Sequence, residues 1–523
     1  MKIDFKKNRP KGFNYKEDEL LISLINETEK LIAETQNLYF YDTIKLDKKQ
    51  RQILSTLIIE FAEDLHCDIG LWNSVEYYNK QLLNTPLPLF VNSGIEIKQV
   101  FDVNRIKCFI HTLLFEFEPD LILAPNHKDL GLLAQNISVF LYNNFHNAPK
   151  TSSIKEYLTQ PNDFGWDFKR KLVWIGTNSY LFRPSFNRYI TENNKGKIEI
   201  TAIDDFVCQE NTIWTGLGVT DILAKALDLP AKTNNDVRSW YERYVSYYRV
   251  ISSTSDVLTL ENIINKIQYE VHLAVEQCNV FKIDNIIFGG IVPYNDYWYW
   301  SGVQLDCGKL NSSSIDKLKK DFIRNASRIV YRYDKQLLNK AKDNLHQHYK
   351  DFIAFFGSDL VTFKDGLSMA AALQKKDRKK YESLSKNELE THMKKHGLKN
   401  PFPRMDLPND LLNSENGVGV YFNPEEGTEM MFGFDDVIRG FKKNGKNLTD
   451  NETKAIRDFI TSDAISPKFV KTIVDKYGTK SIKDSFCINS EIIPKDFGID
   501  YLLRKYKGQY FRNKYPEITL IDD

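Results

Sequence analysis

Apolar residues recur every three or four positions along most of the first 145 residues, which is the pattern of amphipathic helices. Asp47 precedes one such pattern and can cap its helix, and Pro86 and Pro88 end the first helical region. Residues 1–13 precede the first helix and read as a loose basic arm. The pattern predicts helices over residues 15–31, 48–65, 71–83, 101–117 and 129–145.

The stretch over residues 281–307 carries the strongest strand signal. Its β-prone runs, Ile286–Val292 and Tyr297–Gln304, flank a Pro-Tyr-Asn-Asp turn and predict a hairpin. Alternation along the second run places Trp298 and Trp300 on one face and two tyrosines on the other. Because large aromatic side chains favour burial, we expect both faces of this strand to be covered.

The other segments before residue 375 show mixed patterns. Residues 171–182 are ambiguous between a strand and a buried helix, and residues 198–203 alternate as a strand. Residues 352–356 and 360–363 flank a Gly-Ser-Asp turn and predict a second hairpin. Helical patterns cover residues 219–228, 236–250, 260–277 and 314–352.

The chain after residue 374 reads as a linker followed by a helical module. Thr449-x-x-Glu452 is a capping box, and helices are predicted over residues 424–441, 450–460 and 467–477. The expected fold class is α+β, predominantly helical, with small β-hairpin elements. The expected regions are an N-terminal helical region (1–100), a mixed α/β core with the aromatic hairpin (101–374), a charged and Pro-rich linker (375–408) and a helical C-terminal module (409–523).

Composition narrows the class of protein. Of 523 residues, 42% are hydrophobic and 27% are charged, which predicts packed cores rather than disorder. Lys plus Arg is 71 and Asp plus Glu is 70, so the net charge does not indicate a nucleic-acid partner, although a local patch can still bind one. No signal peptide or membrane-spanning run is seen, and the six cysteines lack metal or redox spacing, so a cytoplasmic location is expected.

Two segments are candidates for chemistry. Gly216-Leu-Gly218 opens a predicted helix, whose backbone amides can bind an anion; the alternative is an ordinary turn, because position 221 is Asp where a dinucleotide fingerprint has glycine. Asp163 and Asp167 lie one helical turn apart beside two basic residues, as in a catalytic carboxylate pair. The alternative is a helix start whose carboxylates favour the helix dipole.

The aromatic hairpin supplies a third candidate. Trp298 and Trp300 are interpreted as a wall beside a ligand pocket, with Ser301 and Gln304 as polar contacts, or else as plain core. No zinc, Walker or nucleophile-elbow motif is present, so no metal site is expected and the cofactor is unknown.

The segments 288–304, 359–367 and 416–427, which include Phe-Gly-Gly-Ile-Val-Pro-Tyr-Asn-Asp-Tyr-Trp-Tyr-Trp-Ser-Gly, resemble an uncharacterised bacterial protein family with a Trp-Tyr-Trp-Ser-Gly hairpin. The resemblance covers the second half of the chain at most. It implies a bacterial cytosolic origin and no particular activity.

Two functions are compatible with these patterns. The first is a binding or regulatory protein that recognises a protein or nucleic-acid partner, with residues 409–523 as the protein-binding module. Met430 and Met431 are adaptable apolar residues on the helix predicted there. The alternative is an enzyme acting on a phosphorylated or nucleotide-like ligand through Gly216 and the Asp163/Asp167 segment.

Overall fold

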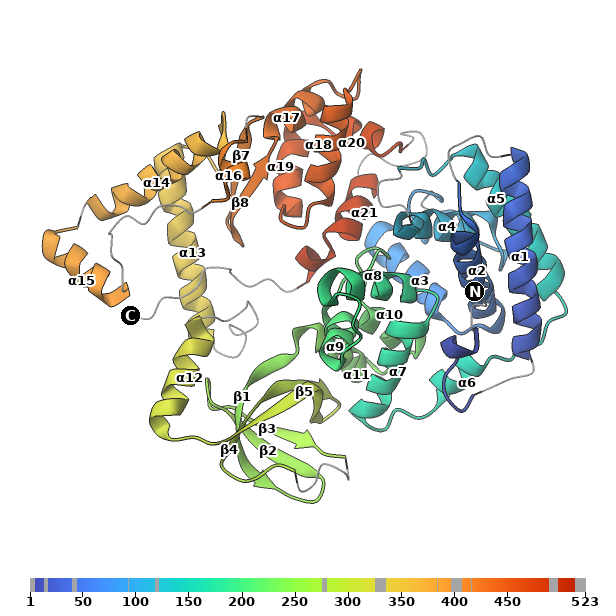
Figure 1. The fold of residues 1–523 in the computed structure, drawn as a ribbon, viewed down its shortest axis with the longest axis horizontal. Helices are drawn as coiled ribbons and strands as arrows, with labels where there is room; N and C mark the ends of the chain where they lie inside the picture. Colours follow the sequence, from blue (N-terminus) through green and yellow to red (C-terminus); the bar gives the residue numbers. More distant parts are fainter. Residues whose placement is uncertain are drawn as a thin grey trace. The chain divides into compact units, whose positions relative to one another are not determined.

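The computed structural model describes residues 5–13, 17–39, 45–92, 94–117, 122–274, 280–324, 335–382, 384–396, 407–414, 416–488 and 497–512 (Figure 1). The chain divides into two compact units. Unit 1 comprises Met1–Ile323 and Phe486–Gln509, and unit 2 comprises Arg324–Ser485 and Tyr510–Asp523. The predicted fold class is confirmed, because helices predominate beside two small sheets.

Unit 1 contains a helical body built around a large apolar core. Its stacked Phe61 and Phe109 rings lie 4.3 Å apart between centroids, and both side chains are fully buried. Of the described helices, none is both long and apolar enough to cross a bilayer. The elements of the body are η1 (Phe5–Asn8), α1 (Glu17–Tyr39), α2 (Lys48–Cys67), α3 (Leu71–Leu83), α4 (Val103–Phe117), α5 (Lys128–Phe145), α6 (Ser153–Thr159), α7 (Gly165–Asn178), α8 (Arg183–Asn194), α9 (Ile200–Gln209), α10 (Val219–Ala226), α11 (Ala231–Arg238), η2 (Ser239–Glu242) and α21 (Phe497–Tyr506).

Two segments of the body for which the sequence suggested a strand are helical. The ambiguous residues 171–182 fall mostly in α7, which ends at Asn178. The strand predicted over residues 198–203 is wrong, because α9 begins at Ile200. Ile198 and Ile200 are 65% and 67% exposed, so their alternation does not mark a buried strand face.

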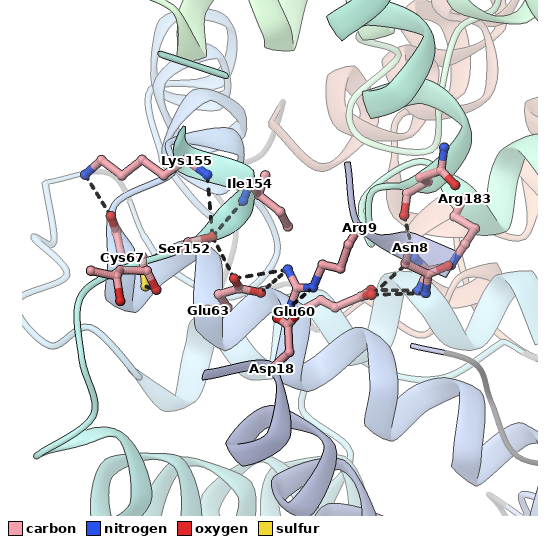
Figure 2. Close-up of polar contacts among 12 residues, drawn as sticks. Asn8, Arg9, Asp18, Glu60, Glu63, Cys67, Ser152, Ile154, Lys155 and Arg183 are labelled. Atoms are coloured by element: carbon pink, nitrogen blue, oxygen red, sulfur yellow. Dashed lines mark hydrogen bonds and ion pairs between the residues drawn. The ribbon is translucent and has the colours of Figure 1, made fainter. Parts of the chain in front are cut away.

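The prediction of a loose N-terminal arm is also wrong for its described part. Arg9 is buried, and its guanidinium pairs with Glu63 at 2.8 Å and Asp18 at 3.2 Å (Figure 2). It also lies 4.2 Å from the centroid of the Phe5 ring. Burial raises the pKa of Glu63, although Arg9 acts to lower it. The arm is therefore fastened to α2 by buried charges, which are costly to leave unpaired.

A five-stranded closed barrel follows the body in unit 1. Its order is β1-β2-β3-β5-β4, and all neighbouring strands pair antiparallel except β3 and β5, which are parallel. A five-stranded Greek-key barrel is the architecture of the OB-fold. The strands are β1 (Tyr244–Ser253), β2 (Val257–Asn262), β3 (Gln268–His272), β4 (Asn285–Tyr294) and β5 (Tyr297–Lys309). Figure 1 shows the barrel in light green next to α7, α9 and α11 of the same unit.

The barrel overturns two predicted helices. Residues 236–250 hold the end of α11, η2 and the start of β1, and the described part of residues 260–277 holds the end of β2 and β3. Tyr248, Val250, Leu258 and Leu260 are buried at alternate positions. Closure of the barrel hides one face of each strand, and β-branched and aromatic residues favour this environment.

The predicted aromatic hairpin is confirmed as β4 and β5, with Asn295 at the turn in a left-handed conformation. Trp298 and Trp300 pack inside the barrel and are half-buried, whereas Tyr299 on the opposite face is buried in the core of the helical body. Both faces of β5 are therefore covered between Trp298 and Ser301, by two different cores, whereas Val303 and Leu305 farther along the strand are exposed. α12 (Ser312–Arg324) follows, and its Phe322 ring packs on Tyr247 of β1 at 5.6 Å.

Unit 2 combines a three-stranded sheet of order β6-β7-β8 with helices. Its apolar residues include Val420 and Phe352, which pack in one cluster. Its elements are α13 (Lys335–Phe356), β6 (Leu360–Phe363), α14 (Gly366–Glu382), α15 (Lys386–His396), α16 (Asn409–Leu412), β7 (Val418–Asn423), β8 (Gly427–Phe432), α17 (Phe434–Lys442), α18 (Asp450–Thr461), α19 (Pro467–Tyr477) and α20 (Lys480–Ser485); η5 (Gly508–Phe511) lies at the junction of the two units in the sequence.

Several sequence predictions in unit 2 need correction. The second hairpin is wrong, because residues 352–356 end α13 and β6 pairs with β7. The helix predicted from residue 424 is wrong in its first half, where β8 is a strand and carries both methionines. The Thr449 capping box is confirmed, with the Thr449 amide donating to Glu452 at 2.8 Å. The expected boundaries at 374 and 408 both lie within unit 2, and residues 486–509 group with unit 1.

We expect Trp300→Ala to lower the free energy of unfolding by about 3 kcal/mol, because it removes an aromatic side chain from the barrel core. The Trp300 ring lies 5.5 Å from that of Phe281 and stacks on it. Val303→Ala is the matched control on the same strand, because Val303 is 54% exposed. Urea unfolding followed by circular dichroism measures both; equal small losses would contradict a barrel core containing Trp300.

Candidate functional site

The start of α7 packs directly on β5. A Cβ atom at Gly165 would lie 2.6 Å from the Tyr299 ring, so only glycine permits this approach. The Tyr294 hydroxyl donates to the Asn162 carbonyl at 2.7 Å, and the Trp240 indole donates to the Pro293 carbonyl at 2.6 Å. The first of these bonds positions the segment before α7 against β4, and the second positions η2 against the same strand.

A buried charge network joins the same elements. Asp204 of α9 pairs with Lys169 of α7 and with Arg243, which directly precedes β1. Ser301 of β5 donates to Asp204 at 2.8 Å and accepts from the Lys169 ammonium at 3.1 Å. Asp204 and Ser301 are both buried. We call Lys169, Asp204, Arg243 and Ser301 the Asp204 network.

The charges of the Asp204 network indicate that it holds α7, α9 and the barrel together rather than acting in catalysis. Burial alone would raise the pKa of Asp204, but the charges of Lys169 and Arg243 outweigh it and lower that pKa. Burial would lower the pKa of Lys169, but its neighbours Cys208 and Asp204 outweigh burial and raise that pKa, so the amine stays protonated. An ammonium is not a general base, and the Ser301 hydroxyl donates to a carboxylate. Ser301 and Lys169 therefore lack the arrangement of an activated serine nucleophile.

Beside this network, four aromatic side chains gather on the surface. Phe164 and Trp166 stack with ring centroids 4.6 Å apart, and His272 of β3 lies 3.9 Å from Tyr297 of β5. The two pairs meet, because Phe164 and His272 are 6.1 Å apart. Phe164 is 40% exposed and Tyr297 is 37% exposed. We call Phe164, Trp166, His272 and Tyr297 the aromatic platform.

Of the predicted carboxylate pair, Asp167 has a structural role at the start of α7. The Asp167 carboxylate accepts from the Phe164 amide at 3.0 Å and thereby caps α7, and it pairs with Arg170. Asp163 is exposed and directly precedes the platform residue Phe164. The capping explanation therefore accounts for Asp167 without a catalytic role.

The predicted glycine site is closely packed. Gly216 has a positive φ of 68°, and a Cβ there would lie 2.3 Å from the Arg504 carbonyl oxygen of α21. The Gly218 amide donates to Asp221 at 2.9 Å, in the capping box of α10. This segment uses the amide of Gly218 within the protein, and Gly216 allows α21 to approach.

The hairpin candidates separate onto two faces of β5. Trp298 lies inside the barrel, 4.8 Å from Tyr244, and Trp300 lies beside it on the same face. Ser301 points to the opposite side, into the Asp204 network. Gln304 donates to the Gly302 carbonyl at 2.5 Å, within its own strand. The structure thus joins Ser301 to α7 but does not join it to the two tryptophans.

Sequence reasoning missed Asp204, Arg243 and His272. His272 fell within a predicted helix, which hid its place on a strand. The signal that was available is Phe-Gly-Trp at residues 164–166, where two aromatics flank a glycine at a helix start.

Within the described residues, no group of three or more His, Cys, Asp or Glu side chains is arranged to hold a metal ion. No protein-family model matches the chain, and no curated protein and no solved structure shows significant similarity to it. The resemblance to a bacterial family therefore stays a prediction.

We expect Asp204→Asn to destabilise the protein by about 3 kcal/mol, because it leaves the half-buried Lys169 without its carboxylate and the buried Arg243 with only the partly exposed Asp205. Asp205→Asn is the matched control, because Asp205 also contacts Arg243 but its side chain is 41% exposed; its cost should stay below about 1 kcal/mol.

The pH dependence gives a second measurement. The folded-state pKa of Asp204 is lowered, so its stabilisation is complete above the unfolded pKa of about 3.9 and is lost as the pH falls through the folded value. Urea unfolding of wild type and Asp204→Asn should therefore differ most near pH 7 and converge in acid. A constant difference would contradict a charged Asp204.

Gly165→Ala tests the close approach of α7 to β5. The added methyl group collides with the Tyr299 ring, so we expect a loss of about 1–3 kcal/mol from overpacking. Gly131→Ala in α5 is the control, because a Cβ there meets nothing within 4 Å and should be tolerated. Thermal unfolding distinguishes them; a stabilised Gly165→Ala would disprove the packing argument.

Proposed function

We propose that this chain is a cytosolic bacterial binding protein that recognises single-stranded nucleic acid by stacking bases on the aromatic platform. The observation that carries the proposal is the platform itself, which places exposed rings from α7 and the barrel side by side. Large exposed apolar clusters on a protein surface commonly mark interaction sites.

The topology of the barrel supports the proposal that the ligand is a polymer. Five-stranded barrels of the OB type bind oligonucleotides and oligosaccharides on their strands and loops, and this part of the argument is an analogy of fold. Tyr297 is the first residue of β5 after the β4–β5 turn, and His272 ends β3. Each base offers a flat face, and stacking on an aromatic side chain contributes about 1–3 kcal/mol per base.

The charges near the platform refine the proposal. Arg170 is largely exposed and pairs with Asp167, and Lys232 is exposed and pairs with Asp296 beside Tyr297. Each cation already has a carboxylate neighbour, so few phosphates would be neutralised. Binding should depend mainly on stacking and only weakly on salt, with fewer than about three counterions released.

The other hypotheses draw less support. A protein partner for residues 409–523 needs that segment as one module, whereas residues 486–509 group with unit 1. Met431 is half-buried on β8, opposite Gly419 of β7. An enzyme acting on a phosphorylated or nucleotide-like ligand needs the Gly218 amide and the Asp167 carboxylate, and both serve as helix caps.

The test is fluorescence anisotropy of the full chain with labelled 15-nucleotide single-stranded DNA and RNA and with the corresponding duplex. We expect a single strand to bind more tightly than the duplex. Phe164→Ala and Tyr297→Ala should each weaken binding by about 5- to 150-fold, equivalent to the loss of one stacked base. Tyr142→Ala is the control, because Tyr142 is 63% exposed on α5, away from the platform residues in the sequence.

Three results would contradict the proposal. The first is that neither single strand binds, and the second is that both platform variants bind like wild type. The third is that Tyr142→Ala weakens binding as much as Tyr297→Ala, which would indicate non-specific contact with exposed rings.

A further inference from the structure

Phe164 and Tyr297, the two exposed rings of the aromatic platform, are each supported on one side by another ring. Phe164 stacks on Trp166, with the ring planes 19° apart and the centroids 4.6 Å apart. Tyr297 lies 3.9 Å from His272, and the two ring planes are tilted by 53°. Phe164 is 40% exposed and Tyr297 is 37% exposed, so each ring keeps surface that a flat ligand can cover.

The outer face of Phe164, which points away from Trp166, is not covered by His272. The His272 ring lies 6.1 Å from Phe164 and 6.5 Å from Trp166, so it is nearly equidistant from the two stacked rings. A ring that covered the outer face of Phe164 would lie much farther from Trp166 than from Phe164. His272 therefore lies beside the stacked pair and leaves the outer face of Phe164 to a ligand.

The ring planes of Phe164 and Tyr297 are not parallel. The His272 plane is tilted by 35° from that of Phe164 but by 53° from that of Tyr297, whereas two parallel rings would make equal angles with it. One flat base cannot lie face to face on two rings that are not parallel. Each exposed ring therefore offers a stacking site for a different base, and both sites border His272.

A buried ring fixes the tilt between the two stacking sites. Tyr299 of β5 is 5% exposed, and its ring centroid lies 5.3 Å from that of Trp166 and 5.7 Å from that of His272. The rings that support Phe164 and Tyr297 thus contact the same buried side chain. Because buried side chains are closely packed and keep their rotamers, the angle between the two sites is a property of the fold.

Building on the proposed function, we propose that the platform binds two neighbouring bases of one strand unstacked from each other, and that it therefore prefers strands whose bases stack weakly, such as oligothymidylate, over oligoadenylate. Neighbouring bases lie parallel when they stack in a free strand, so binding to two tilted rings has to separate them. Adenine, with two fused rings, stacks more strongly on its neighbours than thymine, so separating adenines costs more. Differences in stacking strength and backbone flexibility are the source of modest pyrimidine preferences in single-strand binders generally.

Fluorescence anisotropy of the full chain with labelled 15-nucleotide oligothymidylate and oligoadenylate in the same buffer measures this preference. Both strands carry the same number of phosphates, so counterion release does not distinguish them. We expect wild type to bind oligothymidylate about 3- to 10-fold more tightly. Phe164→Ala and Tyr297→Ala each remove one stacking site, so no neighbouring pair has to be separated and the ratio of affinities should fall to about 1. Tyr142→Ala should keep the wild-type ratio, because Tyr142 lies on α5, outside the platform.

Equal affinities for the two strands, tighter binding of oligoadenylate, or an unchanged ratio in both platform variants would each overturn the preference. If a variant does not fold, wild type at two temperatures below its melting temperature decides, because warming loosens the adenine stacks of the free strand. A ratio that falls on warming supports the proposal, and a constant ratio overturns it. Equal binding of both strands leaves nucleic-acid binding at the platform standing, whereas a lack of binding to either strand overturns both proposals.

Discussion

The charge of Asp204 is the constraint on which the arrangement of unit 1 depends. One buried carboxylate meets cations from two elements, Lys169 of α7 and Arg243 before β1, and a hydroxyl from β5. Removing either cation would leave part of the Asp204 charge uncompensated in a medium that solvates it poorly, so α7, α9 and the start of β1 are held together. The close approach of Gly165 to Tyr299 brings the start of α7 onto the same strand. The aromatic platform depends on this contact between α7 and the barrel, because Phe164 and Trp166 lie at the start of α7 and the other two rings lie on the barrel.

Local signals along the chain were enough to predict many helices but not the barrel. The Asp47 and Thr449 capping boxes mark real helix starts, because a cap depends on residues three positions apart. The strands between residues 244 and 272 were assigned to helices instead. Ile263, Ile267 and Val271 recur at the spacing of a helix, although they fall in the turn after β2 and in β3, and only the closure of the barrel with distant β4 and β5 shows that these residues form strands.

Single residues of the Asp204 network and its surroundings could be predicted from the sequence, but their assembly into one site could not, for a similar reason. The sequence singles out Ser301 and the segment around Asp167 by separate patterns, and the structure joins them through Lys169 and Asp204. The hydrogen bond from Ser301 to Asp204 spans 97 positions of the chain, so no spacing rule connects them. Trp298 and Trp300 were grouped with Ser301 because they are neighbours in sequence. Alternation along a strand separates such neighbours onto opposite faces, and here those faces belong to different cores.

The return of the chain to unit 1 explains why residue 216 is a glycine. The main chain leaves unit 1 after α12 and re-enters it at Phe486, so the larger segment of unit 2, Arg324–Ser485, is an insertion in the sequence of unit 1. Gly216 lets the Arg504 carbonyl of α21 approach closely, and the next residue of that helix, Lys505, lies 4.0 Å from the centroid of the Phe115 ring of α4. A cut at residue 409 would remove α21 and expose the apolar wall that it covers on α4. The packing of α4 in the helical body therefore depends on α21, which a division by sequence order assigns to a different domain.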